Sequence, residues 1–264
     1  MINCLSKTKV GSLFWVLIFL LLPALVHAQG PEWQVFKSTH FIVYYKNASE
    51  NQVSELANRA EGYYDSIAEQ FGFNRFNFWT WDNRARIYLY DNKEDYQNST
   101  RSYNWSGGHV WVNQKLIQVY AQDEQCLNNI LPHELAHIIF LEMVGYNNPA
   151  APLWLQEGVA TYQEQAYSMV KEILAQRIKE NDYLDLQALS YFQAAGQNND
   201  RVTLFYQESN SLVKFLIAQF GKEAFVEFCR SLRDSRNLIT ALRRVYAFNS
   251  LNELETAWKA YILR

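Results

Sequence analysis

The sequence predicts an α+β fold, in which strands occupy the first half of the chain and helices the second. Short runs rich in β-branched and aromatic residues alternate with polar turns up to residue 121. From residue 167 onward, apolar residues recur at spacings of three and four, which is typical of amphipathic helices. We therefore expect one domain over residues 29–264, with a sheet-containing lobe at 29–150 and a helical lobe at 151–264.

The expected strands lie at residues 33–45, 85–90, 109–112 and 116–120, the first of them divided in two by a turn at Ser38 and Thr39. The last two strands flank the polar residues 113–115 and predict a hairpin. We expect this hairpin at the edge of the sheet beside a cleft, where an extended peptide can add as a further strand. An ordinary capped edge hairpin is the alternative.

Three residues near this hairpin have expected roles of their own. Gly107 and Gly108 would let a substrate backbone approach closely, because neither has a side chain. His109 is a candidate for substrate contact. His40, which stands alone in the first strand region, is expected to be a packed or surface histidine.

Helices are expected at residues 48–71, ended by Gly72, and after Asp91, whose carboxylate would cap the first free amides. The aromatic segment 73–81 is either a loop over the cleft or core packing, and core packing is favoured. Residues 196–200 are polar and predict a surface loop. The helices expected in the C-terminal half lie at residues 167–179, 203–220, 222–232, 238–246 and 251–263.

Residues 1–28 have the pattern of a signal peptide. Lys7 and Lys9 precede an almost wholly apolar run at residues 10–22, and Val26 and Ala28 are small residues at the positions that a signal peptidase reads. We expect cleavage before Gln29 and a bacterial protein that is periplasmic or secreted. The alternative is an uncleaved segment that anchors an extracytoplasmic domain to the membrane.

Charge and cysteine content limit the classes of partner. The net charge of −3 becomes −5 once Lys7 and Lys9 are removed, and no stripe of basic residues interleaved with aromatics indicates a nucleic-acid partner. Two cysteines remain after residue 28, Cys126 and Cys229, and they form either a disulfide or two buried free thiols. The sequence does not indicate the oligomeric state.

Residues 131–162 hold the chemistry. His133, Glu134 and His137 form an H-E-x-x-H motif in an apolar segment that reads as a buried helix, and residues four apart on a helix face the same way. Two imidazoles one turn apart suit a zinc ion, and a catalytic zinc site takes three protein ligands. Pro132 indicates that this helix begins there, or that a longer helix from Asp123 is kinked there.

Glu157 is the obvious third ligand, because it lies in a second apolar segment that begins at Pro152. Glu134 points about 100° around the helix from His133, so it is free to act as a general base. Water bound to zinc has a pKa of about 7. An adjacent carboxylate can therefore take the proton of this water and later deliver it to a leaving amine.

H-E-L-A-H followed by W-L-Q-E-G-V-A-T-Y resembles the gluzincin metallopeptidases, and most closely the peptidase MA-like family of secreted or membrane-associated bacterial proteins. The opening F-x-S-x-H-F and the closing L-x-E-L-E-x-x-W extend the likeness over most of residues 29–264. The resemblance implies a thermolysin-like zincin domain with one Zn²⁺ ion bound by His133, His137 and Glu157, and with Glu134 as the base.

The resemblance also implies an oxyanion donor. The family pattern Tyr-x-x-Ser is matched by Tyr206 and Ser209, and a phenol there would stabilise a tetrahedral intermediate; packing of one helix by Tyr206 is the alternative. Thermolysin-like enzymes carry an Asp four residues after the ligand Glu, where this chain has Thr161, so their arrangement around the ligands cannot be transferred.

The expected activity is hydrolysis of peptide bonds in a peptide or protein substrate. No G-A-M-E-N type motif is visible, which favours an endopeptidase over an aminopeptidase. The competing class is a zinc-binding cell-envelope protein that uses the zincin fold for binding or assembly and has no peptidase activity.

Overall fold

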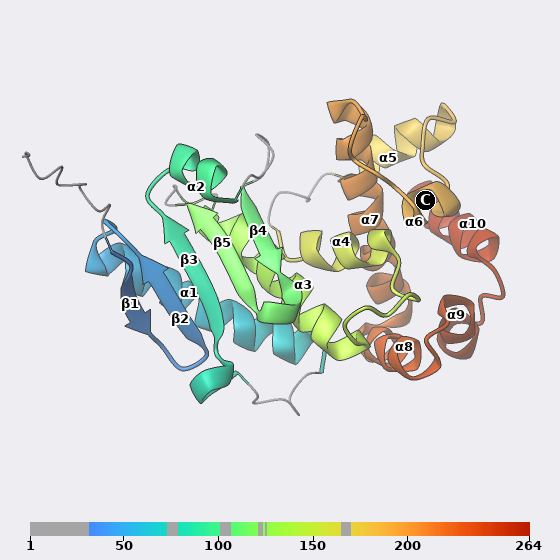
Figure 1. Ribbon diagram of the computed structural model, residues 1–264. Coiled ribbons are helices and arrows are strands. Elements are labelled where there is room, and N and C mark those ends of the chain that lie inside the picture. The colour runs from blue at the N-terminus through green and yellow to red at the C-terminus, as the bar shows by residue number, and fades with distance from the viewer. Residues whose placement is uncertain (1–31, 73–78, 101–106, 121–123, 125, 165–169) are drawn as a thin grey trace, which may run out of the picture. The chain divides into compact units, whose positions relative to one another are not determined.

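Five strands in the first half of the chain form one mixed sheet, and the second half is helical (Figure 1), so the expected α+β fold is confirmed. This computed structural model describes residues 32–72, 79–100, 107–120, 124, 126–164 and 170–264. Residues 31–264 form one compact unit. The expected signal peptide lies outside the described residues, as does most of the aromatic segment 73–81.

The sheet has the order β1-β2-β3-β5-β4. Strands β2 (Phe41–Tyr45), β3 (Ala85–Tyr90) and β5 (Leu116–Tyr120) run parallel, whereas β1 (Gln34–Lys37) and β4 (Gly108–Trp111) pair antiparallel at the two edges. Alternate residues of the parallel strands are buried on one face, as a half-covered sheet requires.

Helix α1 (Glu50–Gln70) covers that buried face beside α3 (Leu131–Val144). It begins with a capping box, in which the Ser49 hydroxyl accepts from the Gln52 amide and the Gln52 side chain accepts from Ser49 N–H. Gly72 follows the helix with φ of 65°, a conformation that few other residues adopt. The expected end of the helix is therefore confirmed.

The expected cap of α2 (Lys93–Thr100) is wrong. The side chain of Asn92, not Asp91, accepts from an amide of the first turn, that of Asp95, at 2.9 Å. Asp91 instead accepts hydrogen bonds from the main-chain and side-chain nitrogens of Asn47. The carboxylate therefore joins the end of β3 to the segment before α1.

The described end of the aromatic segment bears out the favoured core packing only in part: Trp79 packs into the core, whereas Trp81 is 82% exposed. The Trp79 side chain is 1% exposed, and its indole N–H donates to Glu142 at 2.7 Å. Glu142 also binds Lys115 at 3.0 Å, and Lys115 lies over the Trp79 ring. Residues 73–78 lie outside the described residues.

The hairpin is confirmed, and β4 is an edge strand of the sheet. A 3-10 turn at Val112–Gln114 joins the two strands, and Lys115 completes the reversal with φ of 49°. Gly108 and Val110 pair with the buried residues Val119 and Ile117, so they face the helices.

Helix α3 begins at Leu131, directly after a single π-helical turn at Cys126–Ile130. Pro132 lies in the first turn of α3, where its missing N–H costs no helical hydrogen bond. Both expectations for this region are therefore partly confirmed: the α-helix begins near Pro132, and a helical turn of different pitch precedes it.

Helix α4 (Leu153–Thr161) follows α3, and Pro152 occupies its N-cap position without a side-chain cap hydrogen bond. It packs against α7, which is one turn longer at its start than expected, because the Asn198 side chain caps it and Asn199 and Asp200 are helical. The remaining helices agree with the periodic segments, with one further short helix, α6. Their bounds are α5 Val170–Lys179, α6 Leu186–Ser190, α7 Asn199–Phe220, α8 Lys222–Ser235, α9 Leu238–Tyr246 and α10 Leu251–Ile262.

Cys126 and Cys229 are both buried and are not joined to each other by a disulfide, so the first of the two alternatives for these cysteines is not observed. Burial raises the pKa of the Cys229 thiol well above its ordinary value. Within the described parts of the chain, no helix has the length and apolar character needed to cross a membrane.

Candidate metal centre

His133, His137 and Glu157 meet at one point between α3 and α4, with one ligand atom from each lying within 4.8 Å of the others. The two Nε2 atoms are 3.1 Å apart, and each lies 3.6 Å from Glu157 Oε2. In a tetrahedral site with bonds of about 2.0–2.1 Å, ligand atoms lie about 3.3–3.4 Å apart. The three side chains therefore fit a single small metal ion with little rearrangement.

Helix α3 fixes the two imidazoles, because its buried apolar residues hold it between the sheet and the C-terminal helices. His133 and His137 are one turn apart, and their rings meet edge to face at 4.8 Å. Glu134 is only 9% exposed although it carries no ligand atom of the group. Its carboxylate lies beside β4, since a Cβ added to Gly108 would be 2.9 Å from Glu134 Oε1.

The expected reason for Gly107 and Gly108 therefore needs correction. A Cβ on Gly107 would lie 2.3 Å from Ile130 Cδ1, and one on Gly108 would lie 2.6 Å from Ile130 Cγ2. The space that these glycines leave is filled by the chain's own Ile130 and Glu134. Their absent side chains thus bring the edge strand close to the proposed base.

Glu157 is held in place by the packing of α4 against α7. Its neighbour Gly158 packs directly against α7. A Cβ added to Gly158 would lie 2.3 Å from the Ser209 carbonyl oxygen and 2.7 Å from Val213 Cγ2. Only glycine allows this approach, because a backbone carbonyl cannot move aside as a side-chain end can. Gly158 thereby sets the distance of the Glu157 carboxylate from α3.

Glu164 is a residue of the centre that the sequence analysis missed. Its Oε1 lies 2.6 Å from His133 Nδ1, on the opposite side of the ring from the ligand atom. This contact sets the tautomer in which Nε2 is available to a metal, as carboxylates beside ligand histidines do. Thr161, in contrast, donates its hydroxyl hydrogen to the main-chain oxygen of Glu157 at 2.7 Å.

A signal for Glu164 was present in the sequence. It stands seven residues after Glu157, which is two helical turns and the same face. The helix ends at Thr161, but the turn that follows continues the rise, because the Glu164 amide donates to the Thr161 carbonyl oxygen at 3.1 Å.

The electrostatics of the group favour a bound positive charge. Burial by itself would lower the pKa of His133, but hydrogen bonds with Glu157 and Glu164 and the charge of Glu134 raise it well above its ordinary value. Burial would raise the pKa of Glu157, but the charge of His137 and hydrogen bonds with both imidazoles lower it far below its ordinary value.

Two other histidines among the described residues lie outside the group. His40 binds Glu61, with 2.6 Å between Nδ1 and Oε2, and stacks on Tyr64, so it is a packed histidine as expected. His109 is exposed beside Trp111, and because side chains alternate along β4 it faces away from the side on which Gly108 meets Glu134.

Tyr206 lies on α7, one turn before Ser209, whose carbonyl oxygen touches Gly158. Residues three apart on a helix share a face, so Tyr206 lies on the side of α7 that packs on α4. Its ring is partly buried and meets Phe205 edge to face at 5.3 Å. Its role as an oxyanion donor stays a prediction.

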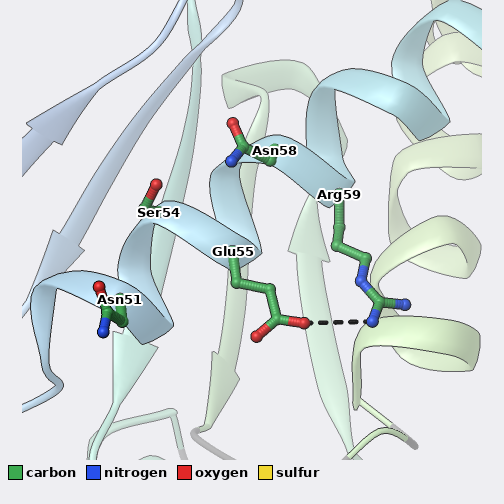
Figure 2. A pocket seen from close by; sticks show the side chains of 5 residues that line it. All are labelled: Asn51, Ser54, Glu55, Asn58 and Arg59. Atoms are coloured by element: carbon green, nitrogen blue, oxygen red, sulfur yellow. Dashed lines mark hydrogen bonds and ion pairs between the residues drawn. The ribbon is translucent and has the colours of Figure 1, made fainter.

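Two hollows differ in their relation to this centre. One is about 530 Å³ and is lined by polar residues of α1 alone, with Glu55 and Arg59 paired at 3.1 Å (Figure 2). The other is about 520 Å³ and is lined by the hairpin, the end of α3 and Gln156 of α4. Neither His133, His137 nor Glu157 lines either hollow, but the second is lined by residues of α3 and α4, the helices that carry this group.

Comparison with known proteins agrees with this geometry. A comparison with curated proteins finds no match. The model of the Peptidase MA superfamily, however, matches residues 80–264, which include the hairpin, α3, α4 and all the C-terminal helices. This match over more than half of the chain, together with a zincin-like arrangement of two histidines and a glutamate, shows that the chain belongs to the peptidase MA superfamily.

Proposed function

We propose that this protein is a zinc-dependent metallopeptidase that hydrolyses peptide bonds, with His133, His137 and Glu157 as the ligands of one zinc ion. The observation that supports this most directly is the close fit of the three ligand atoms to a tetrahedral site. Two imidazoles and a carboxylate are a donor set that zinc takes readily, and three protein ligands leave one position for the reaction. When bound, zinc supplies Lewis-acid chemistry, in that it acidifies water and polarises a carbonyl group.

Glu134 is the general base in this proposal. It follows His133 directly on α3, carries no ligand atom of the group, and has its carboxylate against the edge strand. In that position it takes the proton of the attacking water and returns it to the leaving amine. Its low exposure keeps bulk water from competing for the proton.

The edge strand β4 aligns the substrate. Its outer edge has no strand partner among the described residues, so its backbone groups can pair with an extended peptide. Because Gly108 meets Glu134, a peptide bound along β4 passes the base directly. Tyr206, from α7, is the proposed donor to the oxyanion of the tetrahedral intermediate.

We further propose a periplasmic or secreted bacterial protein, matured by cleavage before Gln29 or anchored by an uncleaved first segment. The partner is a peptide or protein substrate. A mildly acidic chain with no basic stripe supports a role that does not involve nucleic acid.

The test compares wild type with Glu134→Gln. We expect both to bind about one zinc ion and only the wild type to cleave peptides, because the amide cannot accept the proton. Glu94→Gln, which removes the same charge from an exposed position of α2, should cleave normally. The readouts are metal content after dialysis and cleavage of a mixed peptide set by mass spectrometry.

Two outcomes would contradict the proposal. Unchanged cleavage by Glu134→Gln would remove the assigned base. Zinc binding by the wild type without any cleavage would favour the competing class, a zinc-binding cell-envelope protein without peptidase activity.

A further inference from the structure

A hollow of about 520 Å³ lies at the turn of the hairpin, and residues of α3 and α4, the helices that carry the metal-binding group, complete its lining. We call it the hairpin pocket. It is lined by residues 110–114 of the hairpin, Leu141 at the end of α3, residues 146–148 after α3, and Gln156 of α4. Its volume lies within the range of small-molecule and side-chain binding pockets, which is about 300–1,000 Å³.

Each wall of the hairpin pocket continues an element of the metal centre. On β4, Val110 lies two residues beyond Gly108 on the same face, a distance of about 7 Å. On α3, Leu141 lies one turn beyond His137, about 6 Å along the axis. On α4, Gln156 directly precedes Glu157. A peptide lying along β4 therefore reaches the pocket with a side chain one or two residues from the bond at the metal centre.

The lining of the hairpin pocket carries no formal charge. None of the ten residues is Asp, Glu, Lys, Arg or His; they are apolar and aromatic residues together with the amides of Asn and Gln. Tyr146 carries no negative charge, because burial and the nearby Glu142 raise the pKa of its phenol to about 12. Lys115 and Glu142, which stand next to lining residues in the sequence, bind each other at 3.0 Å.

An uncharged lining selects against charge. A charged side chain that enters such a pocket loses hydration and finds no opposite charge in return, whereas an apolar side chain gains by leaving water and an amide finds amide partners. Two charged groups contact lining residues in the described hydrogen bonds, and both do so through main-chain oxygens: Arg236, at an exposed position, donates to the Asn147 carbonyl oxygen, and Arg86, which is partly buried, donates to the Gln114 carbonyl oxygen.

We propose that the hairpin pocket is a substrate subsite that accepts an uncharged side chain, apolar or amide, one or two residues from the scissile bond. This proposal rests on the proposed function, since it names the class of peptide that the same site cleaves. It adds a preference that neither the ligand set nor the edge strand supplies.

The experiment uses zinc-loaded full-length protein and a set of synthetic peptides with randomised sequences, with cleaved bonds identified by mass spectrometry. For wild type, we expect Asp, Glu, Lys and Arg to be depleted about tenfold at one position within two residues of the cleaved bond, the ratio that about 1.4 kcal/mol gives. Asn113→Asp places a negative charge at the exposed rim of the pocket without changing its shape. Lys and Arg should then recover at that position by about threefold to tenfold, as expected for opposite charges about 6 Å apart.

Asn58→Asp is the matched control, because it adds the same charge at an exposed position of the α1 hollow (Figure 2). It should leave the wild-type profile unchanged. If cleavage of peptides with Lys or Arg at that position increased equally in Asn113→Asp and Asn58→Asp, the effect would come from net charge alone. That result would overturn the proposed subsite. A wild-type profile without depletion would also overturn the subsite. So would a profile that favours Asp and Glu, which would indicate that Arg86 or Arg236 attracts the side chain.

A second measurement separates this inference from the proposed function. Binding of the same peptides to zinc-loaded Glu134→Gln protein is followed by affinity selection, which needs no cleavage. Cleavage by wild type without any charge preference overturns the subsite and leaves the peptidase. Selective binding of uncharged peptides without cleavage by wild type overturns the peptidase and keeps the pocket.

Discussion

Replacing Glu164 with glutamine removes one negative charge behind His133 and leaves the size of the side chain unchanged. Glu164 Oε1 lies 2.6 Å from His133 Nδ1, and the two side chains are only 16% and 17% exposed. A contact so short and so well shielded fixes the ring and increases the basicity of the opposite nitrogen. Loss of such a partner weakens metal binding by about 10-fold to 100-fold, or about 1.4–2.7 kcal/mol.

The assay is a competition between the protein and a series of chelators of graded zinc affinity, which gives the zinc Kd of each variant. The matched control is Glu61→Gln, since Glu61 Oε2 also lies 2.6 Å from a histidine Nδ1, that of His40, but outside the metal centre. We expect Glu61→Gln to lower the thermal stability and to leave the zinc Kd unchanged. Equal zinc Kd values for wild type and Glu164→Gln would refute the role given to Glu164.

Three further substitutions test the packing and the charges around the centre. Gly158→Ala should destabilise the protein by about 1–3 kcal/mol or more, because its Cβ would lie 2.3 Å from the Ser209 carbonyl oxygen, and should weaken zinc binding as well; a thermal melt and a zinc titration check this. Gly108→Ala should lower kcat with zinc content unchanged, because its Cβ would push the Glu134 carboxylate from a contact of 2.9 Å; normal kcat would be evidence against the position given to the base. Glu208 is buried, and burial raises its pKa to about 8 from an ordinary 4.5. Between pH 4.5 and about 8, the Glu208 carboxyl therefore keeps its proton in the folded state and has lost it in the unfolded state. Stability should therefore fall as pH rises from about 5 to about 8, by up to about 3–5 kcal/mol, and Glu208→Gln should remove that fall in melts recorded across this range.

Periodicity was sufficient for most of the fold. The alternation of buried residues in β2 and β3 and the three-and-four spacing in α8 and α9 depend only on which face of each element meets the core. Element ends were less predictable where a side chain decides them. Asn92 rather than Asp91 caps α2, and Asn198 starts α7 earlier than its apolar pattern does. Both are short polar residues beside another residue of the same kind, and only the backbone geometry distinguishes them.

The meeting of His133, His137 and Glu157 could be predicted because the spacing of the two histidines is set by the helix itself. His133 and His137 share a face of any straight helix, and Glu157 was the acidic residue of the next apolar segment. The seven-residue spacing from Glu157 was a signal for Glu164, but it was not sufficient, because Glu164 lies beyond the end of α4, in a turn whose path depends on tertiary contacts. The hairpin pocket could not be predicted from the sequence either, since residues of three separate elements line it.

The two buried thiols have a practical consequence for how this protein can be handled. No disulfide joins Cys126 to Cys229, and each is at most 2% exposed. Packing of the described residues therefore does not depend on a disulfide between these two helices. Reducing agents can be present during purification, and thiol-alkylating reagents should label the chain at these positions only once it unfolds.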